Sequence, residues 1–168
     1  MSRVAIGLGS NLSHPRRQIA RALDALARLP RTRLVAVSPN YLTAPIGSAM
    51  AQPDYVNAVA IVETALAPRA LLARLLAIEK RQRRRRTAGE RNAPRTIDCD
   101  LLLFRGRRMR TPALTLPHPR MHERAFVLRP LADVAPFAVV PGHGSVRRLL
   151  AGVGAQRVAR TRSHRRRA

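Results

Sequence analysis

The 168-residue chain contains one cysteine, no tryptophan and only five other aromatic residues, two tyrosines and three phenylalanines. A single thiol cannot form an internal disulfide, which fits a protein of the reducing cytoplasm. We expect Cys99 to be a buried structural thiol, because its neighbours on the same face of the predicted strand are aliphatic. Aromatic residues make up only 3% of the chain, so it offers few rings on which single-stranded nucleic acid could stack.

Long hydrophobic runs are also missing. No apolar stretch approaches the length that a membrane-spanning helix needs, and residues 1–6 lack the apolar core of a signal peptide. We therefore expect no membrane partner and a cytoplasmic location. The apolar fraction of 46% is normal for a globular protein, and the length suits one domain with a hydrophobic core.

Acidic residues are scarce, with nine aspartates and glutamates against 32 basic residues, and the formal net charge is +23. Such a charge favours a polyanionic partner. Nearly all of it comes from arginine, with Lys80 as the sole lysine, and the chain is also rich in alanine and proline. This indicates a compositional bias rather than a nucleic-acid surface. We expect no specific nucleic-acid partner, while a polyanionic small molecule stays a candidate.

Apolar spacing predicts the order strand, helix, strand, strand, helix, strand. The expected strands are residues 3–8, 34–37, 55–63 and 97–104, and the expected helices run from Ser13 as N-cap to Pro30 and from Pro68 to Ile78. This order predicts an α+β fold, a ferredoxin-like βαββαβ antiparallel sheet with helices on one face. The other face would then be free for a site.

The C-terminal third of the chain is expected to add no second domain. Residues 111–151 are rich in proline, with one helical turn near 129–135, and we expect this extension to wrap the sheet. Residues 157–168 are basic and poor in apolar side chains, so we expect a disordered tail with weak, nonspecific affinity for anions. The predicted division is a single domain over 1–156 followed by the tail over 157–168.

Two aspartates stand two residues apart in the last predicted strand. Residues with this spacing project from the same face, so Asp98 and Asp100 would lie side by side, while residues 97, 99, 101 and 103 point into the core. Adjacent carboxylates favour a hard divalent cation, as in phosphoryl transfer. The alternative is structural: an ion pair of Asp98 with Arg95, or of Asp100 with Arg84.

An arginine-dense segment precedes this strand. Within fifteen residues it contains Arg81, Arg83, Arg84, Arg85, Arg86, Arg91 and Arg95. Several of these side chains would simply be solvated. Others could clamp phosphates, because a guanidinium binds phosphate in bidentate geometry. A loop carrying such groups could close over ATP and exclude water.

Other polar residues carry weaker predictions. Asn57 lies within an apolar strand, where it could pair with the edge of a heterocycle or, equally, with the backbone. The histidines at 14, 143 and 164 show no metal-ligand spacing, and we expect them at the surface. Gly7 and Gly9 are not followed by a third glycine at the dinucleotide-binding spacing, so the Rossmann motif is absent.

Several ordered motifs together resemble one enzyme family. The matching segments are residues 9–12 (GSNL), 41–47 (YLTAPIG), 52–58 (QPDYVNA), 78–79 (IE), 94–104 (PRTIDCDLLLF), 114–118 (LTLPH), 121–126 (MHERAF) and 129–131 (RPL). Over about residues 3–150 the chain resembles the 6-hydroxymethyl-7,8-dihydropterin pyrophosphokinases of folate biosynthesis. The resemblance implies a monomeric, ATP- and Mg²⁺-dependent diphosphotransferase. It would move pyrophosphate from ATP to the hydroxymethyl group of the pterin, giving AMP and the pterin diphosphate.

The same resemblance implies residue roles. Asp98 and Asp100 would bind two Mg²⁺ ions, and Arg86 and Arg91 would be catalytic arginines, with Arg85 as the alternative to Arg86. The implied ATP contacts are Glu79, Arg84, Arg86, Arg91, Arg95, His118 and Arg124. Tyr55 and Phe126 would sandwich the pterin, in a pocket completed by Thr43, Ala44, Pro45, Ile46 and Asn57.

The chain departs from the family pattern near the arginines. Asn92 stands where the family often has an aromatic residue, the loop is one residue longer near Gly89, and Pro119 replaces an aromatic residue after the motif histidine. A different function on the same fold would be an RNA-binding module, which needs exposed aromatics on its central strands. The corresponding positions here are Asp98 and Asp100, which repel phosphates without a metal.

Overall fold

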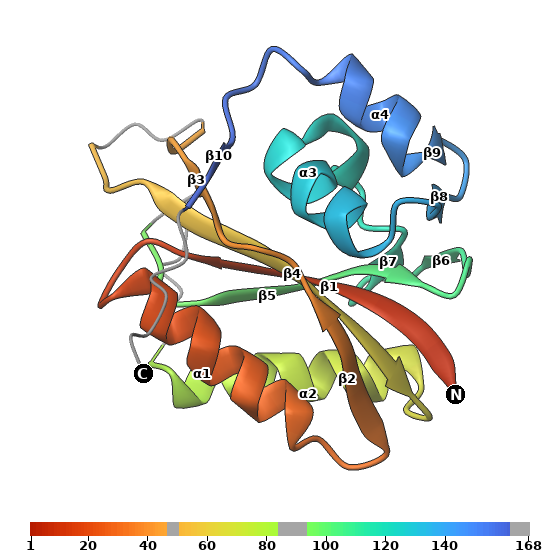
Figure 1. Cartoon of the computed structure of the whole chain (residues 1–168). Coiled ribbons are helices and arrows are strands. Elements are labelled where there is room, and N and C mark those ends of the chain that lie inside the picture. The colour runs from red at the N-terminus through yellow and green to blue at the C-terminus, as the bar shows by residue number, and fades with distance from the viewer. Residues whose placement is uncertain (47–50, 84–93, 162–168) are drawn as a thin grey trace, which may run out of the picture.

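The computed structural model describes residues 1–46, 51–83 and 94–161. An antiparallel sheet forms the middle layer of this part, with α1 and α2 on one face and α3 on the other (Figure 1). Within the described residues no helix has the length and apolar character needed to cross a membrane.

The sheet contains six strands, and every pairing in it is antiparallel. These are β1 (Ser2–Ser10), β2 (Thr32–Val37), β3 (Tyr41–Thr43), β4 (Tyr55–Thr64), β5 (Asp98–Phe104) and β10 (Ala159–Arg160). The path runs β10-β3-β4-β1-β5, and β2 pairs with the other end of the same β4 edge that β3 occupies. All four expected strands are confirmed to within two residues at each end, whereas β3 and β10 were not expected.

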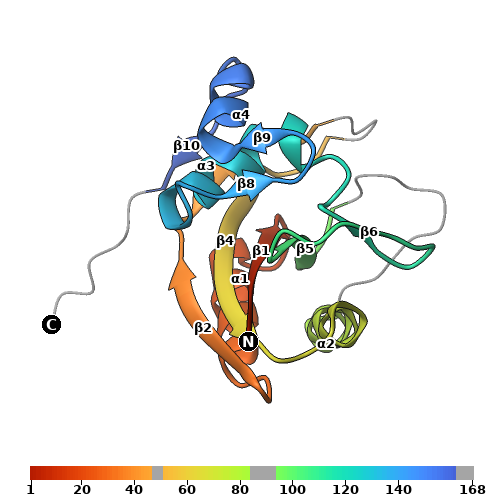
Figure 2. The same cartoon turned by 90° about the vertical axis from the view of Figure 1, so that its right-hand side faces the viewer.

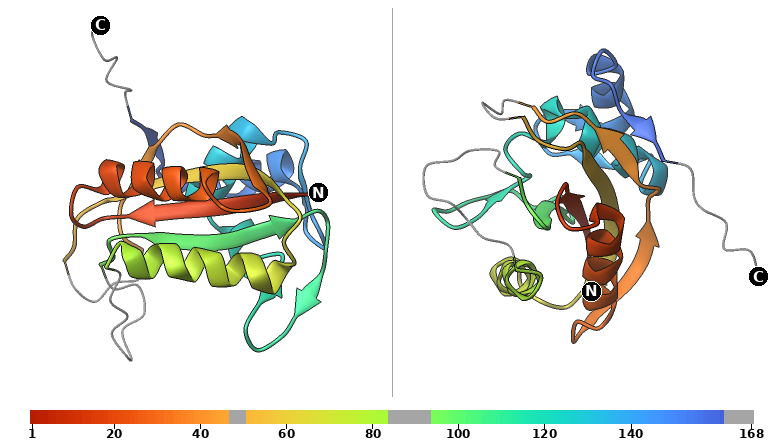
Figure 3. Two further views of the ribbon diagram at one scale, coloured as in Figure 1. Left: turned by 90° about the horizontal axis from the view of Figure 1, so that it is seen from below. Right: turned by 90° about the vertical axis from the view of Figure 1, so that its left-hand side faces the viewer.

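Two amphipathic helices cover the first face of the sheet. α1 (Pro15–Ala27) and α2 (Pro68–Arg81) lie beside each other beneath the strands (Figure 3). Both begin with proline at the first turn, as expected. The predicted N-cap Ser13 is wrong, because the helix starts at Pro15 and its N-cap is therefore His14, with φ of 63° and no side-chain cap.

Both faces of the sheet are buried, and β4 contributes to two hydrophobic cores. Four of its residues face α1 and α2, namely Val56, Ala58, Ala60 and Val62. The residues between them, Val59 and Ile61, join a second core with α3 (Ala125–Val134) and α4 (Val146–Gly152). An apolar run without polar alternation is typical of such a doubly covered strand.

A bulge in β5 overturns one orientation predicted from the sequence. Ile6 pairs with Leu101 but the preceding Ala5 pairs with Leu103, which leaves Leu102 as an extra residue. Leu103 was expected beside Cys99 and Leu101, yet it packs in the α3-side core. The expectation was wrong because one extra residue reverses the facing of every residue after it.

The C-terminal third is more regular than the sequence indicated. One helical turn was expected near 129–135, but the structure has the ten-residue α3, then α4, on the second face. Two small hairpins and a 3₁₀ turn complete this region (Figure 2): β6 (Met109–Arg110) with β7 (Thr115–Leu116), β8 (Val139–Val140) with β9 (Gly144–Ser145), and η1 (Met121–Glu123). The expectation that helices cover only one face is therefore wrong: α1 and α2 lie on the first face, and α3 and α4 lie on the second.

The disordered tail was predicted to start at residue 157, and this boundary is too early in the sequence. Its residues Ala159 and Arg160 form β10, which pairs with Leu42 and Tyr41 of β3. Backbone hydrogen bonding to β3 orders this segment, and such pairing leaves no mark in local composition. Residues 162–168 lie outside the described part of the chain.

Two adjacent leucines of α2 provide a test of the first core. Leu75 is fully buried, whereas Leu76 is 41% exposed. We expect Leu75→Ala to lower the free energy of unfolding by about 2–5 kcal/mol, since it removes a core side chain and leaves a cavity. The matched Leu76→Ala variant should change it by less than about 1 kcal/mol. Urea unfolding measures both, and equal losses would contradict the described burial.

Candidate functional site

A cavity of about 340 Å³ lies on the α3 side of the sheet, and we call it the pocket. It is formed by β1, β4 and β5, the segment after β3, and the start of α3. Its polar and aromatic lining residues are Thr43, Tyr55, Asn57, Arg95, Asp98, Asp100, Arg120, Glu123, Arg124, Phe126 and Gln156. Most of the residues singled out in the sequence are thus brought together from segments far apart in the chain.

Two glycines of β1 lie at the centre of the pocket. Gly9 pairs with Asn57 of β4 on one side and Asp98 of β5 on the other, and Gly7 pairs with Asp100. A Cβ atom on Gly9 would lie 3.2 Å from Oδ1 of Asn57, so the missing side chain leaves room for that amide. From the sequence, both glycines were compared with the dinucleotide-binding motif and Gly9 was part of the matching segment 9–12, but neither was given this role. Their spacing of two along a strand was the available sign.

Asp98 and Asp100 both line the pocket, as the spacing predicted, and Cys99 between them is buried. Asp98 also forms the ion pair considered as the structural alternative: its Oδ2 lies 2.6 Å from Nη1 of Arg95, with both side chains 20% exposed. Burial lowers the pKa of Arg95, but Asp98 and Tyr55 together raise it by more, so the pKa lies above its usual value. The guanidinium of Arg95 therefore stays charged beside the aspartates.

The donor set is compatible with one class of metal. No group of three histidine, cysteine, aspartate or glutamate side chains suited to a metal exists among the described residues. This argues against a closed structural zinc site, which takes four protein ligands. Two neighbouring carboxylates open to a cavity fit Mg²⁺, which keeps several waters and binds through one or two carboxylates and substrate phosphates.

Two further arginines, Arg120 and Arg124, line the same pocket as the aspartates. Burial, and then the neighbouring Arg120, lowers the pKa of Arg124, while Asp100 and Asp98 oppose this shift. The guanidinium carbon of Arg124 lies 5.5 Å from the centre of the Phe126 ring. The pocket thus presents both positive and negative groups, a combination suited to a ligand carrying both phosphates and cations.

His118 lies close to this charged wall without lining the pocket. Its backbone N–H donates to the carbonyl of Leu102 at 2.9 Å, and its Nδ1 accepts the backbone N–H of Arg120 at 3.3 Å. Burial, followed by the charge of Arg124, lowers the pKa of His118 below its usual value. The imidazole is therefore neutral at pH 7, and its Nε2 is left as the N–H donor.

The two aromatic residues expected around a pterin both line the pocket. Tyr55 comes from the start of β4, with the guanidinium carbon of Arg95 5.9 Å from its ring centre, and Phe126 comes from the start of α3. Asn57 is buried, and its amide donates to the hydroxyl of Thr43 at 2.8 Å. The smaller residues Ala44 and Ile46 line the pocket as well, whereas Pro45 between them does not.

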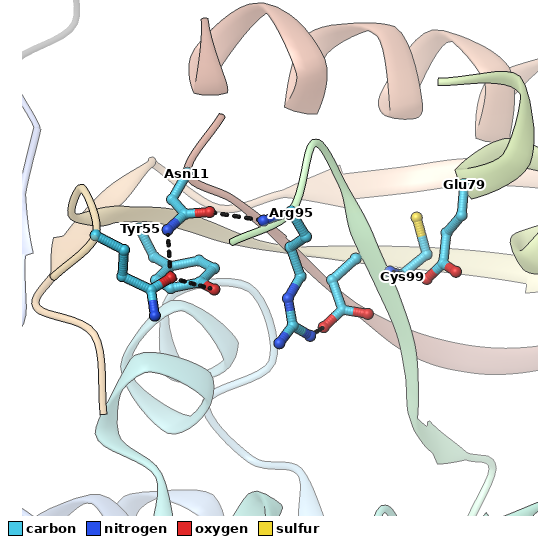
Figure 4. A network of polar contacts seen from close by, with 7 residues as sticks. Asn11, Tyr55, Glu79, Arg95 and Cys99 are labelled. Carbon is cyan, nitrogen blue, oxygen red and sulfur yellow. Dashed lines mark hydrogen bonds and ion pairs between the residues drawn. The ribbon is translucent and has the colours of Figure 1, made fainter. Parts of the chain in front are cut away.

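Asn11 connects three parts of the site. From the sequence it was only a member of the matching segment 9–12, with no role assigned to it. Its Nδ2 donates to Oε1 of Gln52 at 2.8 Å and to the carbonyl of Pro53 at 3.0 Å, and its Oδ1 accepts the backbone N–H of Arg95 at 2.9 Å (Figure 4). Oε1 of Gln52 in turn accepts a hydrogen bond from the hydroxyl of Tyr55. An asparagine directly after an apolar strand was the available sign.

Some predicted residues lie elsewhere. Glu79 is buried on α2, on the opposite face of the sheet, where its Oε1 accepts the backbone N–H of Cys99 at 2.9 Å. It therefore supports the strand that carries the aspartates and does not line the pocket. The predicted arginines Arg84, Arg86 and Arg91, together with Arg85, Gly89 and Asn92, fall outside the described residues.

Comparisons with known proteins agree on one family. A sequence model described as "7,8-dihydro-6-hydroxymethylpterin-pyrophosphokinase (HPPK)" matches residues 5–136, so residues 137–168 lie outside the match. A Pseudomonas aeruginosa protein named 2-amino-4-hydroxy-6-hydroxymethyldihydropteridine pyrophosphokinase is 52% identical over 151 residues, covering 90% of this chain and 91% of that protein. A Haemophilus influenzae protein of the same name is 45% identical over 136 residues, covering 81% and 83%.

Solved structures support the fold at low sequence identity. A Plasmodium falciparum HPPK-DHPS structure with pteroate has a TM-score of 0.70 at 14% identity, covering 90% of this chain. This chain spans 42% of that longer protein. A second structure, the A437G variant with SDX-DHP, has a TM-score of 0.69 and is covered to 45%.

Gly9 gives a test of the packing at the pocket. In Gly9→Ala the new Cβ would lie 3.2 Å from Oδ1 of the buried Asn57. We expect the free energy of unfolding to fall by about 1–3 kcal/mol, as for overpacked cores. The control is Gly152→Ala, because no atom lies within 4 Å of the added Cβ there. Urea unfolding compares the two, and an unchanged Gly9→Ala variant would argue against the described contact.

Proposed function

The chain belongs to the 7,8-dihydro-6-hydroxymethylpterin-pyrophosphokinase family, and on that premise we propose that it transfers a pyrophosphoryl group from ATP to the hydroxymethyl group of 6-hydroxymethyl-7,8-dihydropterin. The products are AMP and the pterin diphosphate, in a step of folate biosynthesis. The observation that carries the proposal is the pocket itself, which is lined by Asp98 and Asp100 together with arginines and two aromatic side chains.

The phosphates of ATP are assigned to the charged side of the pocket. Arg95 and Arg124 line it, and their fixed positive charges would stabilise negative charge that moves during the transfer. His118, neutral at pH 7, is assigned a hydrogen bond to the nucleotide through its Nε2–H. The loop residues Arg84, Arg86 and Arg91 are proposed to complete this phosphate site, with Arg85 as the alternative to Arg86. Glu79 is kept as a support of β5 rather than a direct contact.

Asp98 and Asp100 are proposed to hold two Mg²⁺ ions. When bound, Mg²⁺ neutralises phosphate charge and favours in-line displacement. The aspartates contribute by projecting from one strand face into the pocket, where β5 holds them in a fixed spacing. Arg95 orients Asp98 through the 2.6 Å ion pair.

The pterin is assigned to the end of the pocket between Tyr55 and Phe126. Two aromatic faces there offer stacking surface to a planar heterocycle. The bond from the Asn57 amide to Thr43 orients that side chain and directs its Oδ1 toward Gly9. Oδ1 can then accept a hydrogen bond from an exocyclic amino group of the ring. Ala44, Pro45 and Ile46 would add the rim, and the paired polar groups would give selectivity.

Several broader features belong to the same proposal. We describe the core β1-α1-β2-β4-α2-β5 as ferredoxin-like, supported by the strand order β2-β4-β1-β5. A single catalytic domain that includes β10, a monomeric state and a cytoplasmic location complete the proposal. Size-exclusion chromatography with light scattering tests the monomer, for which one chain of 18.6 kDa is expected.

The nucleic-acid alternative finds less support. It requires exposed aromatics on the central strands. Among the described residues the corresponding positions of β5 carry Asp98 and Asp100, and both line a cavity rather than a flat surface.

The activity is tested by mixing the protein with ATP, Mg²⁺ and hydroxymethyl-dihydropterin. We expect pterin-dependent release of AMP, measured by chromatography of the nucleotides, and loss of this release when EDTA removes the metal. ADP as the nucleotide product, or AMP release that ignores the pterin, would rule the function out.

The aspartates are tested by Asp98→Asn and Asp100→Asn, which remove charge at nearly constant volume. We expect each to lower kcat by at least about a hundredfold, since several kcal/mol of charge stabilisation depend on them. Asp24→Asn on the exposed side of α1 is the matched control and should keep the full rate. An undiminished rate in either site variant would overturn the metal assignment.

A further inference from the structure

We infer that Gln156 is a positioning residue for Arg124 and Phe126, and that residues 156–161, here called the strap, hold two walls of the pocket together. The inference rests on the proposed function, because it concerns binding of the pterin. The strap lies in the segment that the sequence assigned to the end of the domain and the disordered tail.

Gln156 makes two hydrogen bonds that bracket Arg124. Its Nε2 donates to the backbone carbonyl of Glu123 at 2.8 Å, and its Oε1 accepts the backbone N–H of Ala125 at 2.9 Å. One side chain therefore fixes the chain on both sides of a pocket residue. Gln156 itself lines the pocket.

These bonds also complete the start of α3. The helix begins at Ala125, and its N-cap residue Arg124 makes no side-chain capping bond. The first N–H groups of a helix have no partner within the helix. Gln156 supplies one from 31 residues away, so the first turn of α3 depends on a remote segment.

The consequence reaches two proposed substrate contacts. Arg124 and Phe126 flank Ala125, and the Arg124 guanidinium carbon lies 5.5 Å from the Phe126 ring centre. A first turn that can fray would let both side chains leave these positions. Gln156 thus keeps one wall of the pterin site in its binding geometry before the ligand arrives.

The other end of the strap is bonded to the opposite wall. β10 pairs with β3, with Arg160 opposite Tyr41, and the N–H of Thr161 donates to the carbonyl of Asn40 at 2.9 Å. β3 leads directly to Thr43, which holds Asn57 in the pocket. In Figure 1 the segment between α4 and β10 passes from the α3 side to the β3 edge.

The link between the two anchors is short. Gln156 and Ala159 are three residues apart, which limits their separation to about 10 Å of extended chain. A short connection bonded at both ends restricts how far the α3 wall and the β3 wall can separate. A pocket organised in advance binds its ligand more tightly, because less ordering has to occur on binding.

The test uses the full chain with Gln156→Met, which keeps side-chain length but removes both hydrogen bonds. We expect the pterin Kd, measured by titration calorimetry, and the pterin KM to rise about tenfold, since each lost bond is worth about a factor of ten at most. The KM for ATP should rise as well, because Arg124, which the two lost bonds bracket, is assigned to the ATP phosphates. Gln156→Glu keeps an acceptor for the Ala125 N–H and should restore part of the affinity.

Gln82→Met is the matched control. Gln82 also bridges two segments, donating to the carbonyl and to Oε1 of Gln18 at 2.9 and 2.8 Å, but it does so on the α1–α2 side of the sheet. We expect it to lower stability in urea as Gln156→Met does while leaving the pterin Kd within about twofold. This separates positioning from a general loss of stability.

The outcomes are distinct. Suppose that the wild-type protein binds the pterin and that the Gln156→Met variant has the same pterin Kd. The strap proposal would then be wrong, and the proposed function would stand. An equal loss of pterin affinity in Gln82→Met would also overturn the strap. A wild-type chain that neither binds the pterin nor releases AMP would overturn the proposed function.

Discussion

The antiparallel pairing of β1 with both β4 and β5 is the constraint on which the rest of the structure depends. It makes β1 a central strand and brings Asn57, Gly9 and Asp98 into one row across the sheet. Because Gly9 carries no side chain, the amide of Asn57 can approach β1 closely, and the pocket opens between the polar groups on either side. A residue with a Cβ at this position would crowd the amide.

Charge determines what the pocket can bind. The chain has few acidic residues, yet three of them, Asp98, Asp100 and Glu123, line the same cavity, together with three arginines. The ion pair between Arg95 and Asp98 is both a structural bond and part of the site, since both residues line the pocket and the bond orients their side chains. The structural alternative raised from the sequence and the functional assignment are therefore compatible. Buried pairs of this kind are seldom explained by stability alone.

The second face of the sheet serves both packing and function. α3 buries the hydrophobic residues of β4 that point away from α1 and α2, and its first turn supplies an aromatic wall of the pocket. The same turn depends on Gln156, and β10 returns the chain to the β3 edge. Segments late in the sequence therefore hold pocket side chains in place next to elements from earlier in the chain.

The sequence by itself determined the main strands, the two long helices, and the position of Asp98 and Asp100 on the same face of one strand, because these follow from local periodicity. It also indicated Tyr55, Asn57 and Phe126 through family motifs. Only the tertiary structure decided the roles of Gly9, Asn11 and Gln156, the facing of Leu103 and the place of Glu79. Each of these features depends either on a contact with a residue distant in the chain or on the bulge in β5. Distant contacts and bulges leave no periodic pattern in the surrounding residues.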